Sequence, residues 1–181
     1  MTEEMALEAA VHWCRETLVM DSTCVIVGLG SGFHIAELIK QNKMDKVYVV
    51  DHRPQLVAAF QSQFPDLQEK VEVIIIKDEP SLMGHKLMDQ VIEHNLSSLA
   101  FSVCWPAGDV ILKNLHRHLS GRSKESLEIF FSKYGIKKDI QIQDESGNRY
   151  LNIRDLEMMI QEEVPSYLRL NCFRILKELI L

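Results

Sequence analysis

Three closely spaced glycines are the feature of this sequence that most clearly suggests a binding site. Gly28, Gly30 and Gly32 directly follow the apolar run 23–27, and a helical pattern comes after them. A strand that turns into a helix through glycines presents bare backbone N–H groups and a helix N-terminus, which suit phosphate and other polar ligand groups. We therefore predict that this loop, including Ser31, lines a ligand site.

The spacing of the glycines and a following acid narrow the class of ligand. Asp51 ends the next apolar run, where an acid accepts hydrogen bonds from ribose hydroxyls in nucleotide sites. The dinucleotide fingerprint G-x-G-x-x-G/A would need a small residue where this chain has Phe33, so a standard NAD site is disfavoured. The alternative is that the glycines only let the strand and its helix pack tightly, with no ligand.

Other polar and aromatic side chains follow the predicted strands, at the edge where ligands of open α/β sheets bind. His34 is predicted to form a hydrogen bond in the crevice or, equally, to bond a backbone carbonyl of the turn. His52, with Arg53, could engage a carboxylate or phosphate, or be exposed. Asp78 could contact an adenine amino group, or belong to a solvated loop, and Trp105 could stack on a ring.

Catalytic and metal-binding motifs are missing from the sequence. The cysteines are Cys14, Cys24, Cys104 and Cys172, with no C-x-x-C pair, and there is no H-E-x-x-H, G-x-S-x-G or P-loop lysine motif. We therefore predict no metal site and name no catalytic residue.

The elements that position these residues alternate along the chain. Apolar runs predict strands at 23–27, 46–50, 71–76 and 98–104, and helical patterns predict helices at 3–18, 35–41, 54–64, 81–94 and 110–119. Alternation of this kind indicates a Rossmann-like three-layer sandwich with a mostly parallel sheet in the order 3-2-1-4.

The C-terminal part departs from this alternation. It predicts helices at 123–134, 153–162 and 165–181, and a hairpin formed by 138–143 and 149–153. We expect one domain over 1–181, with a βα core at 1–109 that 110–181 completes. The last helix has a wide apolar stripe, which either docks on its own sheet or forms a homodimer contact.

Composition sets limits on the partners and the compartment. The 181 residues carry a formal net charge of −6, which argues against nucleic acid or an anionic membrane as the main partner. Glu3, Glu4 and Glu8 stand where a signal peptide would be basic, and no apolar run is long enough to span a membrane. We predict a cytoplasmic protein.

Two family resemblances add to these patterns. The G-x-G-x-G spacing resembles that of S-adenosylmethionine-dependent methyltransferases, but Ile26 replaces their usual acid and Cys104-Trp105-Pro106 replaces their Asn-Pro-Pro-aromatic motif. The stretch 25–35 followed by 47–51 resembles the Rossmann-like N-terminal region of motility accessory factor proteins, implicated in flagellin glycosylation. That resemblance covers roughly the first two-thirds of the chain and implies a free-standing module without the family's glycosyltransferase domain.

Three functions follow as expectations. The first is a nucleotide- or nucleoside-binding accessory module that works with a partner, and we prefer it narrowly. The second is an S-adenosylmethionine-dependent methyltransferase acting on a small molecule. The third is a ligand-free scaffold that dimerises through its C-terminal helix. S-adenosylmethionine and nucleotides are thus the candidate cofactors.

Overall fold

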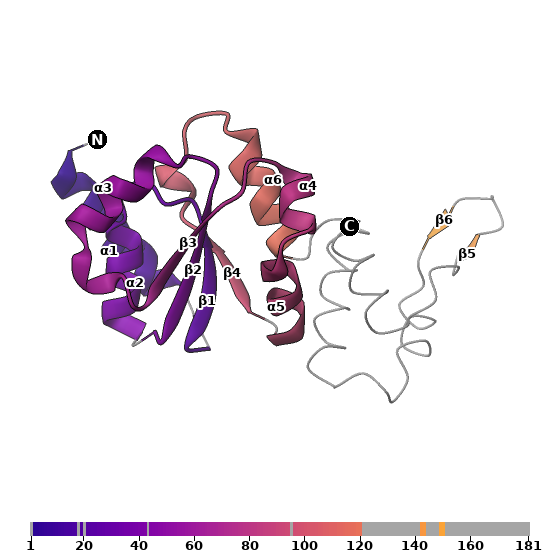
Figure 1. Ribbon diagram of the computed structural model, residues 1–181, viewed down its shortest axis with the longest axis horizontal. Coiled ribbons are helices and arrows are strands. Elements are labelled where there is room, and N and C mark those ends of the chain that lie inside the picture. Colours follow the sequence, from indigo (N-terminus) through magenta and orange to yellow (C-terminus); the bar gives the residue numbers. More distant parts are fainter. Residues whose placement is uncertain are drawn as a thin grey trace. The chain divides into compact units, whose positions relative to one another are not determined.

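A computed structural model describes residues 2–17, 19, 21–42, 44–94, 96–120, 142–143 and 149–150. The chain divides into two compact units, Met1–Ser120 and Gly121–Leu181. The first unit contains the glycine loop and a sheet with helices on both faces (Figure 1). The single domain expected over 1–181 stays a prediction.

The sheet of the first unit has four parallel strands in the order β3-β2-β1-β4. The strands are β1 (Thr23–Val27), β2 (Lys46–Asp51), β3 (Val71–Ile75) and β4 (Ser97–Ala100). In register, Val27 of β1 lies beside Val50 of β2 and Ala100 of β4. This topology confirms the predicted strand order and the Rossmann-like α/β class.

Helices cover the two faces of the sheet, as Figure 1 shows. On one face lie α1 (Glu3–Glu16), α2 (Phe33–Asn42) and α3 (Gln55–Gln63), and on the other lie α4 (Glu79–Met83), α5 (Lys86–His94) and α6 (Val110–Leu119). Two short 3-10 helices, η1 (Pro65–Leu67) and η2 (Ser102–Cys104), complete the unit. A parallel sheet needs such covering because its strands are apolar on both faces.

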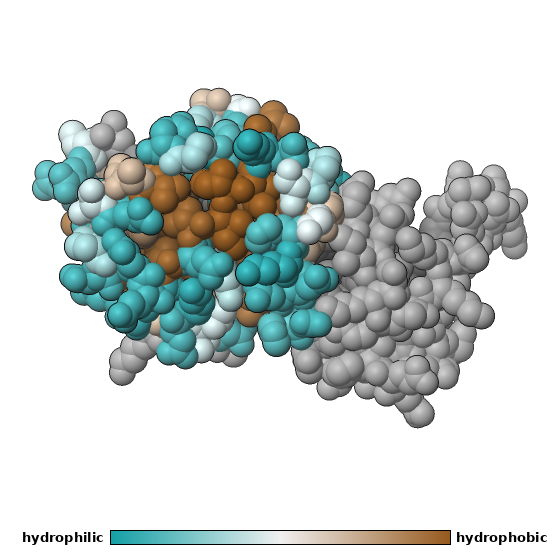
Figure 2. Space-filling model, in the orientation of Figure 1, coloured by the Kyte–Doolittle hydropathy of each residue, from teal (hydrophilic) through white to brown (hydrophobic). Residues whose placement is uncertain are grey.

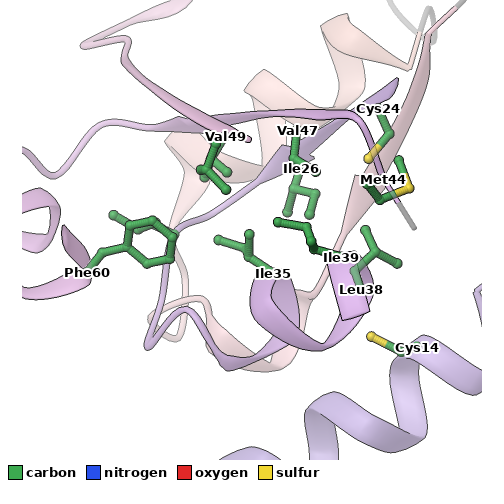
Figure 3. Packing of buried hydrophobic residues seen from close by; sticks show 12 residues of the cluster. Cys14, Cys24, Ile26, Ile35, Leu38, Ile39, Met44, Val47, Val49 and Phe60 are labelled. Carbon is green, nitrogen blue, oxygen red and sulfur yellow. The ribbon is translucent and has the colours of Figure 1, made fainter. Parts of the chain in front are cut away.

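Two apolar cores result from the alternation of side chains along each strand. Ile26 belongs to the core beneath α1–α3, whereas Val25 and Val27 belong to the core beneath α4–α6. Figure 3 shows the first core, in which Ile35 of α2 points toward the strands and Phe60 of α3 closes one side. These cores fix the strand ends where the glycine loop begins.

Two predicted elements end differently in the structure. The strand predicted at 98–104 stops at Ala100, because Phe101 packs on a ring of α2 and the chain then turns through η2. The helix predicted at 81–94 is two helices, separated at Gly84 and His85. The first of them begins early because the Asp78 side chain accepts a hydrogen bond from the Ser81 N–H, 2.9 Å, and caps it.

The second unit is described only at a short hairpin. Strand β5 (Ile142–Gln143) pairs antiparallel with β6 (Arg149–Tyr150), within the predicted hairpin. The helices predicted at 123–134, 153–162 and 165–181 lie outside the described residues, as does the homodimer contact expected of the last one. Within the described part of the chain, no helix is long and apolar enough to cross a membrane.

Candidate functional site at the glycine loop

The glycine loop has a backbone shape that strongly favours glycine. Gly28, Gly30 and Gly32 have φ angles of 95°, 51° and 83°, a region that other residues rarely adopt. The Gly28 N–H donates to the carbonyl oxygen of Val50 at 2.8 Å, and the Gly32 N–H donates to that of Leu29 at 3.0 Å. The loop is therefore attached to the end of β2 and bonded to itself.

Side chains of the same chain fill the space over all three glycines. A Cβ atom on Gly28 would overlap the indole nitrogen of Trp105, and one on Gly30 would lie 2.6 Å from the Cβ of Cys104. A Cβ on Gly32 would lie 2.6 Å from the ring of Phe60 and 2.7 Å from that of Phe64. Real Cβ contacts are essentially never this short, so the packing of these four side chains requires glycine.

Trp105 is held over the loop from two sides. Its indole N–H donates to the carbonyl oxygen of Val27 at 3.0 Å, at the end of β1. Its ring also meets the ring of His116 from α6 edge-on, with centroids 6.2 Å apart. The η2 turn thus returns the chain to the first strand end, where a ring-stacking role for Trp105 was predicted.

The carboxylate of Asp51 is fully buried and bonded within the chain. Its Oδ2 accepts from the Leu29 N–H and from Nη2 of Arg53, both at 2.7 Å. Its Oδ1 accepts from the Arg53 N–H at 2.9 Å and from Nε of Arg53 at 2.8 Å. Burial acts to raise the pKa of Asp51, but the bonds from Arg53 and Leu29 outweigh it and hold that pKa below its ordinary value.

His34 is buried in an aromatic cage formed by Trp13 and Phe101, with ring centroids 5.8 Å and 4.8 Å away. Its Nε2 lies 3.1 Å from the carbonyl oxygen of Gly28, so Nε2 carries the proton and donates it. Burial lowers the pKa of His34 to about 4, against the opposing effect of the Gly28 bond. The imidazole is therefore neutral, and its Nδ1 has no hydrogen-bond partner among the described residues.

The remaining predicted residues lie around this centre. His52 pairs with Asp109, Nε2 to Oδ2 at 2.9 Å, and Asp109 in turn caps α6 by accepting from the Leu112 N–H at 3.0 Å. Ser31 is exposed. Asp78 is exposed and occupied in capping α4, so the structure gives it a local role and shows no contact between it and the loop.

The structure thus brings together some of the predicted residues and adds others. The loop glycines, His34, Asp51 and Trp105 meet at the carboxyl ends of the strands, with His52 next to Asp51 in the chain. Sequence patterns did not predict that Cys104 and the Phe60–Phe64 pair occupy the loop. The available signal was the i, i+4 spacing of Phe60 in α3 and Phe64 at its C-cap.

The chemistry offered by this arrangement is limited. Burial raises the pKa of Cys104 to about 12, so it is a thiol and a poor nucleophile at neutral pH. Asp51 is neutralised by Arg53. Within the described ranges, no group of three or more His, Cys, Asp or Glu side chains could hold a metal ion.

Fold and loop together define a Rossmann-like α/β unit whose first loop is packed by its own chain. Comparison of the sequence and structure with protein-family models, curated proteins and solved structures gives no match. The resemblances to motility accessory factors and to methyltransferases therefore stay predictions, and the functional conclusion depends on the contacts described above.

Proposed function

We propose that this chain is a non-catalytic Rossmann-like scaffold whose glycine loop packs against its own chain instead of binding a nucleotide. One observation carries the proposal: Trp105, Cys104, Phe60 and Phe64 fill the space over Gly28, Gly30 and Gly32. In dinucleotide sites of this fold, the backbone at the second loop glycine approaches the pyrophosphate. That glycine is Gly30 here, and the side chain of Cys104 lies against it. The contacts thus favour the scaffold among the three expected functions.

The hydrogen-bonding groups of the loop support the same proposal. A nucleotide site uses free loop amides for phosphate and a free acid for the ribose. Here the N–H groups of Gly28 and Leu29 donate to Val50 and Asp51. The carboxylate of Asp51 also accepts three bonds from Arg53. A ligand would have to displace protein partners from both groups.

A nucleotide- or nucleoside-binding module is the second candidate function. The observation that favours it is the meeting of Gly28, Gly30 and Asp51 at the carboxyl edge of a parallel sheet, where ligands bind in this class of fold. Binding there requires Trp105 to leave its bond with Val27 and Arg53 to release Asp51. A methyltransferase would require the same two movements.

Calorimetric titration of the full chain separates the two functions. The ligands are S-adenosylhomocysteine, NAD, ADP and UDP-glucose, and each is titrated into the wild type, Trp105→Ala and Val103→Ala. Trp105→Ala opens the space over Gly28, whereas Val103→Ala changes a neighbouring side chain that is 61% exposed and serves as the control. The scaffold predicts no binding to any of the three proteins.

Two results would contradict the scaffold proposal. Saturable binding by the wild type would show that Trp105 moves aside readily and would establish the nucleotide-binding function. Binding gained by Trp105→Ala, but not by Val103→Ala, would show a competent site that the indole closes. Either result should be accompanied by a rise in thermal midpoint with ligand concentration, as expected for binding to the folded state.

A further inference from the structure

In the described part of the chain, the strand β3 forms one edge of the sheet. Among the described residues it has a strand neighbour on one side only, namely β2. In Figure 1 it lies at the front of the sheet, between α3 and α4. An edge of this kind presents unpaired backbone groups to any chain that can extend the sheet.

The backbone bonds identify which residues of β3 face outward. The Lys70 carbonyl oxygen accepts from the Val47 N–H at 2.8 Å, and the Ile76 N–H donates to the Asp51 carbonyl oxygen at 2.9 Å. In a parallel ladder every second residue of a strand bonds to the same neighbour. The alternate residues Val71, Val73 and Ile75 therefore direct their N–H and C=O groups to the open side.

The side chains along this edge offer little protection against pairing. Natural edge strands are protected by lysine, proline, bulges or covering segments. The only charged residue in β3 is Glu72, and its carboxylate is paired with Lys46 of β2 at 3.2 Å. Val73 and Ile75 are partly exposed, and Figure 2 shows an apolar area between α3 and α4, where β3 lies.

We propose that β3 pairs antiparallel with β3 of a second copy of this chain, around a two-fold axis at Val73. In this register Val73 faces Val73 of the copy, and Val71 faces Ile75. These are the residues whose backbone groups point outward, so every one of those groups finds a partner. Two four-stranded sheets become one continuous sheet with closed symmetry.

Charge complementarity favours a second copy as the occupant and sets the register. With the axis at Val73, the exposed Glu69, two residues before β3, comes near the exposed Lys77 of the copy, two residues after its β3, and two-fold symmetry makes this pair occur twice. With the axis at Glu72, the two Glu72 carboxylates would oppose each other. With the axis at Ile74, Glu69 would face Glu79.

This inference goes beyond the proposed function, because β3 can pair whether or not the glycine loop binds a ligand. It is tested by sedimentation velocity of the full chain over a concentration series. Glu69→Lys or Lys77→Glu alone places like charges opposite each other twice, and each should raise the dimer dissociation constant about tenfold. The double variant Glu69→Lys/Lys77→Glu restores the opposite-charge pairs. Its dimer dissociation constant should be within about twofold of the wild-type value.

A matched control and an independent readout complete the test. Glu8→Lys makes the same charge change at an exposed position of α1, and should leave the constant unchanged. In hydrogen exchange, the amides of Val71, Val73 and Ile75 should gain protection as protein concentration rises. All variants are checked for native circular dichroism.

Four results would overturn the proposal. The first is a monomer at every concentration. The second is a dimer whose dissociation constant is unchanged by either single charge reversal. The third is protection of the Val71, Val73 and Ile75 amides that does not depend on concentration, which would mean that another segment of the same chain covers β3. Protection that appears only on adding an extended partner peptide would equally exclude pairing between copies.

Discussion

Gly28 and Trp105 form the closest of the contacts at the glycine loop. The glycine has a φ of 95°, and the indole nitrogen stands where its Cβ would be. Gly108 has a similar φ of 77°, but a Cβ there would meet nothing within 4 Å. Comparing substitutions at Gly28 and Gly108 therefore separates the loss of stability due to backbone strain from the loss due to steric overlap.

Substitution of these glycines should give unequal losses of stability. Gly28→Ala should lower the free energy of unfolding by roughly 3 kcal/mol, because left-handed strain and overpacking add together. Gly108→Ala should lower it by about 1 kcal/mol, from strain alone. Urea unfolding measures both values, and equal losses would show that Trp105 moves aside without cost.

The Trp105→Ala variant tests the contact between Gly28 and Trp105 directly. In a Trp105→Ala protein the overlap is gone, so adding Gly28→Ala should cost only about 1 kcal/mol more. The difference between the two backgrounds is the coupling between the residues. Strictly additive losses would contradict the packing role assigned to the loop.

His34 should make stability depend on pH in mildly acidic solution. Its pKa in the folded chain is about 4, below the ordinary value of 6.5, so the unfolded chain takes up the proton first. Stability is therefore fully present above pH 6.5 and falls as pH decreases toward 4, by roughly 3 kcal/mol in total. The carboxyl of Asp51, whose pKa is lowered from the ordinary value of 3.8, loses its contribution mainly as the pH falls through and below that value.

The measurement is urea unfolding at a series of pH values between 7 and 4, on the wild type and His34→Leu. Between pH 7 and 4, the free energy of unfolding of His34→Leu should fall much less than that of the wild type. His12→Gln, at a histidine whose side chain is 73% exposed, is the control and should follow the wild type. An unchanged slope in His34→Leu would assign the pH dependence to other groups.

At the scale of elements, Asp109 joins the end of β2 to the start of α6. One oxygen caps the helix through the Leu112 N–H, and the other pairs with His52. Asp109→Ala should lower the free energy of unfolding by about 2 kcal/mol, because both interactions are lost. Asp109→Ser keeps a capping oxygen and should recover about 1 kcal/mol of that loss, as measured by thermal and urea unfolding. Equal losses in the two variants would mean that the cap contributes nothing.

The elements themselves were largely predictable from the sequence. Unbroken apolar runs gave β1 and β2, and their alternation with helices gave the strand order. The end of β4 was not predictable, because Phe101 and Cys104 have the apolar character of a strand yet leave the sheet to pack on His34 and Gly30. Local pattern does not report contacts with residues this distant in the chain.

The place of the glycine loop was predicted, but the side chains that pack against it were not. Glycine spacing and the acid at Asp51 correctly placed a loop at the carboxyl edge of the sheet. The indole of Trp105 comes from far along the chain, and nothing in the spacing of the glycines shows whether a ligand or a side chain fills their space. Arg53 was nearer to being predictable, because it lies two residues after the acid that it neutralises.

At the scale of the whole molecule, the two described cores and the four-stranded parallel sheet lie within the first compact unit. A chain ending at Ser120 should therefore fold by itself and unfold in one cooperative transition, with the far-ultraviolet circular dichroism of a mixed α/β protein. A truncated chain without a cooperative transition would show that residues 121–181 contribute to the stability of the first unit.

Close packing over the loop also constrains which mutations can accumulate, and in what order. A larger residue at position 28 meets Trp105 in addition to the strained backbone, so an earlier change of position 105 to a smaller residue would lower its cost. The same order applies to Gly32 with Phe60 and Phe64, whereas Gly30 meets the Cβ of Cys104, an atom that alanine or serine at position 104 would keep. Packing against neighbouring side chains is thus enough by itself to retain each glycine, whether or not a ligand binds. A protein of this kind can keep the appearance of a nucleotide-binding motif indefinitely, as a record of its packing.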